Sequence, residues 1–241
     1  MTEPTPTPEA PNASLWEDFI DIFTSPSEVF RRRENAGFGV PLLILTVIFA
    51  ILVLGTKPLV QPAIDADMAR GMAHAMKAHP EITAAQMQQQ QAMGEKVGTY
   101  FIVIAIPIMA MLTGIVLWMV GKIFDSKQTA SQGLMVATYA FLPKIFASIA
   151  GTLIAYLSSP ERLNGLARLS SGPAALLNPD TTSPGVIALL ARLDVFTIWE
   201  TILLAIGLQI TGKGSKSNAY VAVVIVWLIG ALPGLLGALR Q

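Results

Sequence analysis

The sequence predicts an all-α membrane protein, a polytopic helix bundle with about five transmembrane helices and an N-terminal interfacial amphipathic helix. Charged residues make up only 13% of the chain and hydrophobic residues 53%, whereas soluble domains carry roughly a quarter charged residues. The apolar residues also fall into blocks of membrane-spanning length. A soluble fold could not cover five such blocks with so few polar side chains.

Five blocks have the length and composition of membrane spans, which need about 20 mostly apolar residues. The predicted spans are residues 38–56, 97–121, 131–156, 194–211 and 218–239. Three of them carry no charge, whereas the third contains Lys144 and the fourth, which is the shortest, contains Glu200. Together they predict a five-span membrane domain over residues 37–241.

The chain before the first span divides into two parts. Residues 1–13 are rich in proline, threonine and glutamate, which predicts a disordered tail without a secretory signal. Residues 14–36 predict an amphipathic juxtamembrane helix that opens with a capping box, Ser14 and Glu17, and has a second start signal at Ser25 and Pro26.

An aromatic face beside a basic cluster is typical of a helix that lies in the headgroup layer. The candidate membrane-surface anchors are Trp16, Phe19, Phe23, Arg31, Arg32 and Arg33. Packing of the same helix against the spans is the alternative interpretation.

Basic residues in short connections predict the orientation, because they collect on the cytoplasmic side. Such residues precede span one and occupy the connections between spans two and three and between spans four and five. They are Arg31, Arg32, Arg33, Lys122, Lys127, Lys213 and Lys216. The remaining connections are long and mix acids with bases, so we expect a cytoplasmic N-terminus and an outside C-terminus.

Lys144 and Glu200 are the most informative single residues. A charge at the centre of a span costs about 2.5–3.5 kcal/mol on insertion scales, so such groups usually pair inside the bundle. By sequence count at about 1.5 Å per residue, both lie roughly 17 Å from the inner ends of their spans. We expect an ion pair that is either a structural clamp or a site for a proton or small solute; no contact is the third alternative.

Two further patterns concern helix shape and packing. Pro143 beside Lys144, with Tyr139 one turn earlier, predicts a bent helix and makes Tyr139 and Pro143 candidate cavity-lining residues. In span five, Gly230, Gly234 and Gly237 provide the small-residue spacing that allows close helix approach, within the bundle or to another copy of the chain.

The sequence shows no pattern typical of an enzyme active site or a cofactor site. It contains no His-Glu-x-x-His helix and no Gly-x-Ser-x-Gly elbow, and without cysteine it has no thiol nucleophile or thiolate metal site. The net charge of zero gives no basic excess for nucleic acid. Soft ligands that could hold Cu(I) occur at Met68, Met72, Met76, His74 and His79, but an amphipathic packing face is the simpler interpretation and no metal is expected.

Several segments resemble bacterial members of the Yip1 family of five-span membrane proteins. They are WEDFIDIFTSPSEVFRRR at residues 16–33, HPEITAAQMQQQ at residues 79–90, Gly133, Thr138, Tyr139 and Pro143 in GLMVATYAFLPKIF, and LDVFTIWETILLAIGL at residues 193–208. The Asp-Leu-Tyr-Gly-Pro segment of eukaryotic members has only a lengthened counterpart at residues 21–26, so a GTPase link is not implied.

The resemblance implies a non-enzymatic protein of the cytoplasmic membrane that organises or adapts partners in the lipid bilayer. Its expected partners are other membrane proteins, with a homo-oligomer as one form, and no nucleic acid. Two alternatives are a small-solute or ion carrier that uses Lys144 and Glu200, and a subunit of an envelope complex.

Overall fold

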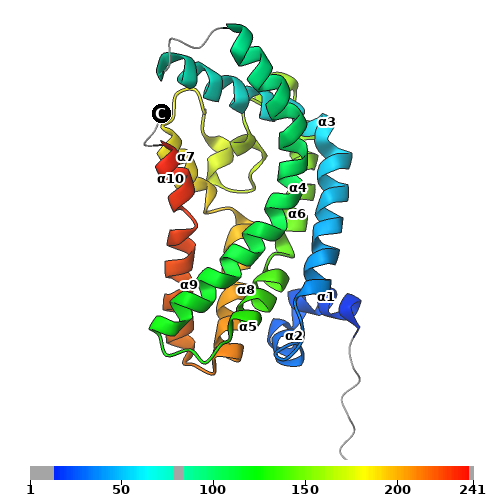
Figure 1. The fold of residues 1–241 in the computed structure, drawn as a ribbon, viewed down its shortest axis with the longest axis vertical. Coiled ribbons are helices and arrows are strands. Elements are labelled where there is room, and N and C mark those ends of the chain that lie inside the picture. The colour runs from blue at the N-terminus through cyan, green and yellow to red at the C-terminus, as the bar shows by residue number, and fades with distance from the viewer. Residues whose placement is uncertain (1–13, 79–83, 239–241) are drawn as a thin grey trace, which may run out of the picture.

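The computed structural model describes residues 14–78 and 84–238, and every regular element in these ranges is helical, which confirms the all-α prediction (Figure 1). The predicted disordered tail, residues 1–13, lies outside the described residues. Helix α1 (Leu15–Thr24) begins with the predicted capping box, and α2 (Pro26–Arg32) follows it after a single residue. The juxtamembrane segment is therefore two short helices.

Among the described residues, five helical segments are long and apolar enough to cross a membrane, in agreement with the predicted number. They are α3 (Gly39–Ala78), α4 (Ala84–Ile123), α5 with α6 (Ala130–Ala140 and Pro143–Leu157), α8 (Val195–Gly212) and α9 with α10 (Lys216–Ile229 and Leu232–Ala238). Helices α3 and α4 are each 40 residues long and run well beyond the predicted apolar blocks.

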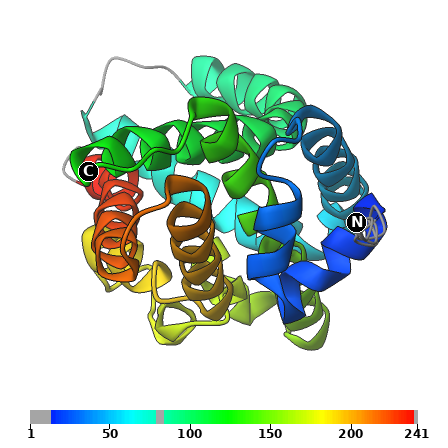
Figure 2. The same cartoon turned by 90° about the horizontal axis from the view of Figure 1, so that it is seen from below.

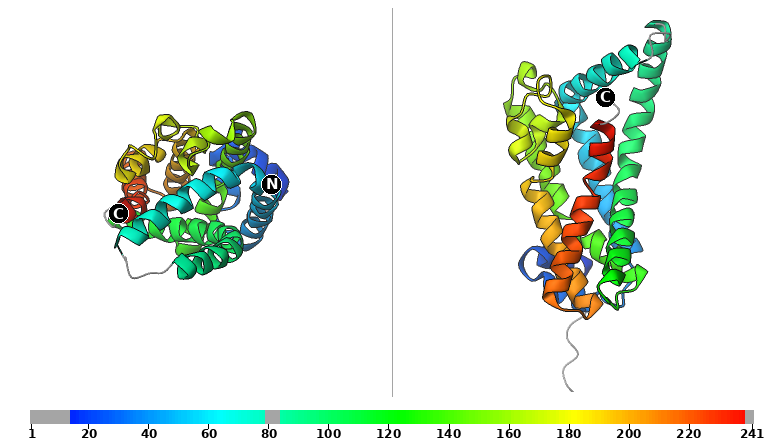
Figure 3. Two further views of the ribbon diagram at one scale, coloured as in Figure 1. Left: turned by 90° about the horizontal axis from the view of Figure 1, so that it is seen from above. Right: turned by 90° about the vertical axis from the view of Figure 1, so that its left-hand side faces the viewer.

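The spans stand side by side, and the two ends of the bundle differ (Figures 1 and 2). Helices α1 and α2 lie across one end, which we call the α1/α2 end. At the opposite end α3 continues past Pro58 and Pro62, bends, and crosses over the bundle (Figure 3). Prolines inside a helix remove a backbone hydrogen bond and commonly cause such bends. Helix α10 also lies toward this opposite end (Figure 1).

Each span buries one face in the bundle and exposes an apolar face that suits lipid. On α3, Leu45 is fully buried and Phe49 is 6% exposed. The exposed stripe on the other face of α3 consists of Leu43, Val47, Ile51 and Leu54. Their spacing of three or four residues places them on one side of a helix.

Helix α8 is the most enclosed span. Half of its apolar window, 50%, is buried inside the protein, against 22% for the first, second and fifth spans. It contacts α2, α5, α6 and α9. This position explains how the span that looked weakest by sequence can hold Glu200, because its neighbours, rather than lipid, surround the charge.

Helices α4 and α5 cross in close contact at two glycines. A Cβ atom on Gly114 would lie 2.8 Å from the Gly133 carbonyl oxygen, and one on Gly133 would lie 2.7 Å from the Gly114 oxygen. Beyond this crossing α4 buries one face in the bundle, with Leu117 fully buried and Val120 5% exposed, and before it Tyr100 is 73% and Phe101 63% exposed. The glycine crossing therefore fixes where α4 and α5 touch, and the exposed aromatic residues lie on the part of α4 that precedes it.

The long connection between α6 and α8 forms an ordered cap at the end opposite α1. It contains η1 (Pro160–Arg162), η2 (Leu166–Leu169), η3 (Pro173–Leu176) and α7 (Pro184–Ala191). Asp194 caps α8 through the amides of Phe196 and Thr197 and also accepts a hydrogen bond of 2.7 Å from the Ser171 amide. Asp67 of α3 accepts from the Leu166 amide at 2.9 Å. The cap is thus joined both to α8 and to the bent part of α3.

Short connections close the α1/α2 end. Lys213, at the turn after α8, pairs with Glu34 at 2.5 Å, and the Lys127 amide donates to the Gly212 carbonyl at 2.9 Å. The Gln128 side chain donates to the Thr211 hydroxyl at 2.7 Å. These contacts join three segments that are distant in sequence.

Candidate functional site

The third span is interrupted in its middle. Helix α5 ends at Ala140 and α6 begins at Pro143, which occupies the first helical position, where its missing N–H costs nothing. The break places Lys144 in the first turn of α6. An ammonium group at a helix N-terminus is unfavourable, because the helix dipole is positive there. Lys144 therefore needs an anion or strong hydrogen-bond acceptor.

Helix α8 supplies both partners. Lys144 Nζ lies 3.2 Å from Glu200 Oε2 and donates to Thr197 Oγ1 at 2.6 Å. The structure thus brings the two predicted residues together. Thr197 and Glu200 are three residues apart, on one helix face, and are 5% and 8% exposed. Thr197 was not predicted, although its spacing from Glu200 is a usable sequence signal.

A cavity of about 590 Å³ lies beside this pair. Its charged lining groups are Lys144, Glu200 and Arg192, and most of the remaining wall is apolar. The apolar residues come from α3, α4, α8 and α9, with Phe141 from the break in span three. A concave, mostly apolar space with a few convergent polar groups is the usual form of a ligand site.

Arg192 ends α7 just before α8 and is held against α9. Its Nη2 donates to the Trp227 carbonyl at 3.2 Å, and the Trp227 indole donates to the Arg192 carbonyl at 3.3 Å. The guanidinium carbon lies 5.6 Å from the centre of the Trp227 ring, within range of a cation–π interaction. A Cβ on Gly230 would lie 2.8 Å from Arg192 Nη2. Sequence reasoning missed Arg192, because only the turn from α7 into α8 directs it inward.

The predicted lining residues Tyr139 and Pro143 require correction. The cavity is lined by their neighbours Phe141 and Lys144. Tyr139 is fully buried and faces α1, where its ring lies 5.8 Å from that of Phe19 in an edge-on arrangement. Pro143 is also buried and acts by breaking the helix. The interruption of the helix was predicted correctly. Which side chains face the cavity depends on the rotation of α5 about its own axis.

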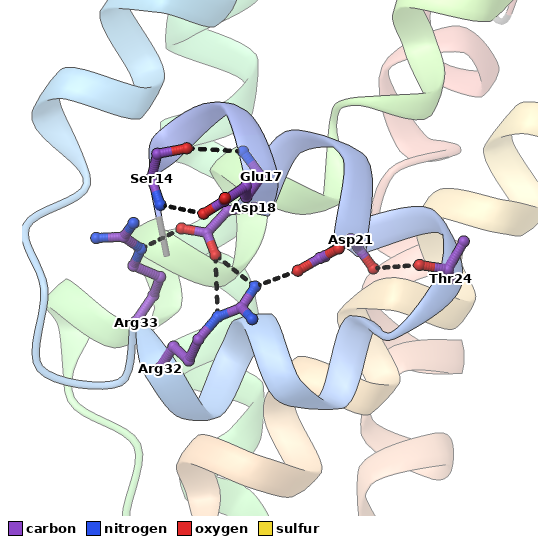
Figure 4. Close-up of polar contacts among 7 residues, drawn as sticks. All are labelled: Ser14, Glu17, Asp18, Asp21, Thr24, Arg32 and Arg33. Carbon is purple, nitrogen blue, oxygen red and sulfur yellow. Dashed lines mark hydrogen bonds and ion pairs between the residues drawn. The ribbon is translucent and has the colours of Figure 1, made fainter. Parts of the chain in front are cut away.

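A buried carboxylate holds α1 and α2 together (Figure 4). Asp18 is fully buried and accepts from Arg32 Nε at 3.1 Å and from Arg32 Nη2 at 2.7 Å, and Arg33 Nε binds its other oxygen. Arg32 also contacts Asp21 at 2.7 Å. The hydrogen bond that Arg32 donates to the Asp21 carboxylate raises the pKa of Arg32, and Asp18 adds to this effect. Two of the three predicted anchoring arginines thus bind within the protein.

The predicted anchoring aromatic residues also fall into two groups, one packed in the protein and one exposed. Phe19 is 8% exposed, and Phe23 packs edge-on against Phe146 and Trp199, with 5.2 Å between ring centres in each case. Trp16 remains 63% exposed, and Arg31 is also exposed. Phe19 and Phe23 therefore pack against the spans, as in the alternative interpretation, whereas Trp16 and Arg31 remain at the surface.

The glycines predicted for helix packing lie at the junction of α9 and α10. A Cβ on Gly234 would lie 2.8 Å from the Ala188 Cβ of α7, whereas one on Gly237 would meet nothing within 4 Å. With Gly230 against Arg192, two of the three glycines make close contacts within the chain. Whether they also serve contact with a second copy stays a prediction.

The methionine-rich segment lies on the bent part of α3. Met68 and Met72 are half-buried and Met76 is exposed, whereas His79 lies outside the described residues. Within residues 14–78 and 84–238, no group of three His, Cys, Asp or Glu side chains converges to hold a metal ion. The copper hypothesis stays untested.

The five apolar spans, the broken third span and the charged cavity define a multi-pass α-helical membrane protein. The Yip1 domain is the family whose sequence model matches, over residues 20–237, nearly the whole chain. The chain therefore belongs to the Yip1 family. Neither a curated protein nor a solved structure matches it.

Replacing Asp18 by asparagine should release α1, because two guanidinium groups lose the carboxylate that neutralises them. Breaking a buried pair costs roughly 3 kcal/mol, which is on the order of a hundredfold in the opening equilibrium. The chain has no cysteine, so an introduced Ile22→Cys, at a fully buried position, reports opening by its rate of maleimide labelling. Asp21→Asn is the matched control, since a partly exposed pair is worth under about 1 kcal/mol. Equal labelling rates in the two variants would contradict the role of Asp18.

Reversing the charges of Lys144 and Glu200 tests whether the pair is a structural clamp. Lys144→Glu or Glu200→Lys alone places like charges together and should lower thermal stability in detergent by roughly 3 kcal/mol. The double reversal should restore most of that stability, since Thr197 can donate as well as accept. The same swap at Lys213 and Glu34, which lie near the surface, should change little. Failure of the double reversal to recover stability counts against the clamp.

Proposed function

We propose that this Yip1-family protein is a non-enzymatic organiser or adaptor of partner proteins in the cytoplasmic membrane. The contact surface in this proposal is the α1/α2 unit, which lies across one end of the bundle (Figure 2). The α1/α2 end faces the cytoplasm, in accord with the basic residues Lys122, Lys127, Lys213 and Lys216 in its short connections. The opposite end, with the cap, then faces outward.

The observation that carries this proposal is an exposed apolar pair on a helix that is held rigidly. Trp16 is 63% and Ile20 is 67% exposed, and their spacing of four residues places them on one face of α1. Asp18, on the buried face, ties α1 to α2, and α2 contacts α8. A fixed tryptophan with an apolar neighbour is a common anchor of protein interfaces. The same face would serve a subunit of an envelope complex.

A small-solute or ion carrier is the second candidate, and the cavity beside Lys144 and Glu200 is the observation that favours it. Transport at this site would involve the proton or charge of Glu200, since intramembrane acids commonly act as relays. The pair is held from two spans and by Thr197, which also suits a purely structural role.

Site-specific photocrosslinking at Ile20 tests the contact surface. A photoreactive residue at position 20 should form reproducible protein adducts in cells. The same residue at position 51 should form lipid adducts only, although Ile51 has the same exposed fraction, 67%, on the apolar stripe of α3. Adducts with a second copy would identify a homo-oligomer as the partner. Only lipid adducts at both positions would show that α1 lies against the headgroups and would contradict the proposal.

Glu200→Gln separates the organiser from the carrier. The substitution removes the charge but keeps the size of the side chain, and Thr197 still accepts from Lys144. We expect unchanged protein adducts at position 20 and unchanged proton flux in proteoliposomes that contain the purified protein. Loss of a flux that the wild type supports, at equal abundance and thermal stability, would favour the carrier.

A further inference from the structure

We propose that the cavity binds one anionic lipid, whose headgroup contacts Arg192 and whose acyl chain lies along the apolar wall between α4 and α9. This inference concerns the cavity inside the bundle and its opening toward the bilayer. It holds whether or not α1 recruits partners.

Among the described residues that line the cavity, two cations, Lys144 and Arg192, accompany one carboxylate, that of Glu200. Lys144 and Glu200 neutralise each other at 3.2 Å, which leaves the guanidinium of Arg192. Among the described residues, no carboxylate lies within ion-pair distance of Arg192, and its buried Nε has no hydrogen-bond partner. Its bond to the Trp227 carbonyl occupies one donor, out of the five that a guanidinium offers. An anion with several oxygens, such as a phosphate diester, satisfies both the charge and the free donors.

The position of Arg192 matches the depth of a lipid headgroup. Helix α8 has 18 residues, beginning at Val195, and at about 1.5 Å per residue it spans roughly 27 Å. That length is close to the ~30 Å hydrocarbon core. Arg192 precedes this helix by three residues and therefore lies near the outer boundary of the core. A soluble anion would not need the apolar wall that continues from here toward the middle of the bundle.

The wall of the cavity suits an acyl chain and opens toward the bilayer. Phe101 and Met109 of α4 both line it, and they are 63% and 50% exposed to the surroundings of the bundle. On the opposite side lie Val226 and Trp227 of α9. The α4 residues that line the cavity, from Phe101 to Thr113, all precede the crossing of α4 with α5 at Gly114. The volume of about 590 Å³ is in the range of sites that enclose drug-sized molecules.

Native mass spectrometry of the purified full-length protein in a mild detergent tests the inference. Phosphatidylglycerol and phosphatidylcholine of equal chain length are the probes. We expect one phosphatidylglycerol to be retained and phosphatidylcholine to be lost at the same activation energy. Arg192→Gln should weaken phosphatidylglycerol retention roughly tenfold, because charge-assisted hydrogen bonds are lost. The matched control is Arg162→Gln, an exposed arginine of the cap, which should leave retention unchanged.

A second variant keeps the test valid if Arg192→Gln fails to fold. Ala105→Phe fills the cavity from α4 without removing a charge and should also weaken retention. Its control is Ala50→Phe on α3, outside the cavity lining. A photoreactive phosphatidylglycerol should label α4 near residues 101–109 in the wild type and not in Ala105→Phe.

Three outcomes would overturn the inference. Equal retention of phosphatidylcholine would mean that Arg192 selects no charge. Displacement of phosphatidylglycerol by an equal concentration of soluble glycerol phosphate would mean that the apolar wall contributes nothing. Retention that survives both Arg192→Gln and Ala105→Phe would place the lipid elsewhere on the bundle. None of these outcomes changes the crosslinks at position 20, so failure of this inference is distinct from failure of the proposed function.

Discussion

The arrangement of the bundle depends on the contact between Lys144 and Glu200, which joins the third and fourth spans. The free-energy cost of placing Lys144 and Glu200 in the membrane is offset only where other helices surround them. This requirement accounts for two features of the fold: α8 is the most enclosed span, and the third span breaks at Pro143 so that Lys144 reaches α8. The hydroxyl of Thr197 completes the coordination of the ammonium group. Helices α5, α6 and α8 therefore form the part of the bundle against which the other spans pack.

Buried carboxylates also organise the two ends of the molecule, each by a different chemistry. Asp18 is neutralised by two arginines and fixes α1 and α2 to each other. Asp194 instead accepts hydrogen bonds from uncharged donors. These are the amides at the start of α8 and the Ser171 amide of the cap. A buried acid is stable when its oxygens are satisfied, by cations or by several N–H groups. The α1/α2 unit and the cap are consequently parts of the folded structure, continuous with the membrane bundle.

Two glycines fix where α4 and α5 cross. The contact of Gly114 with Gly133 lets α4 and α5 touch through their backbones, as small residues commonly allow in membrane helices. The part of α4 that precedes this crossing lines the cavity beside Arg192 and Glu200. The α1/α2 unit at one end and a cavity with charged lining residues toward the other thus coexist in a chain of 241 residues.

The sequence by itself determined the fold class, the five spans and the capping box of α1, because these follow from local length, hydropathy and hydrogen-bond chemistry. It also indicated the Lys144–Glu200 pair, since equal depth and the cost of a lone charge leave few other partners. Only the tertiary structure decided which way Tyr139 faces, that Phe19 and Arg32 bind inside the protein, and that Arg192 enters the cavity. These outcomes depend on helix rotation and on the path of a long connection, both of which are set by packing between segments distant in sequence.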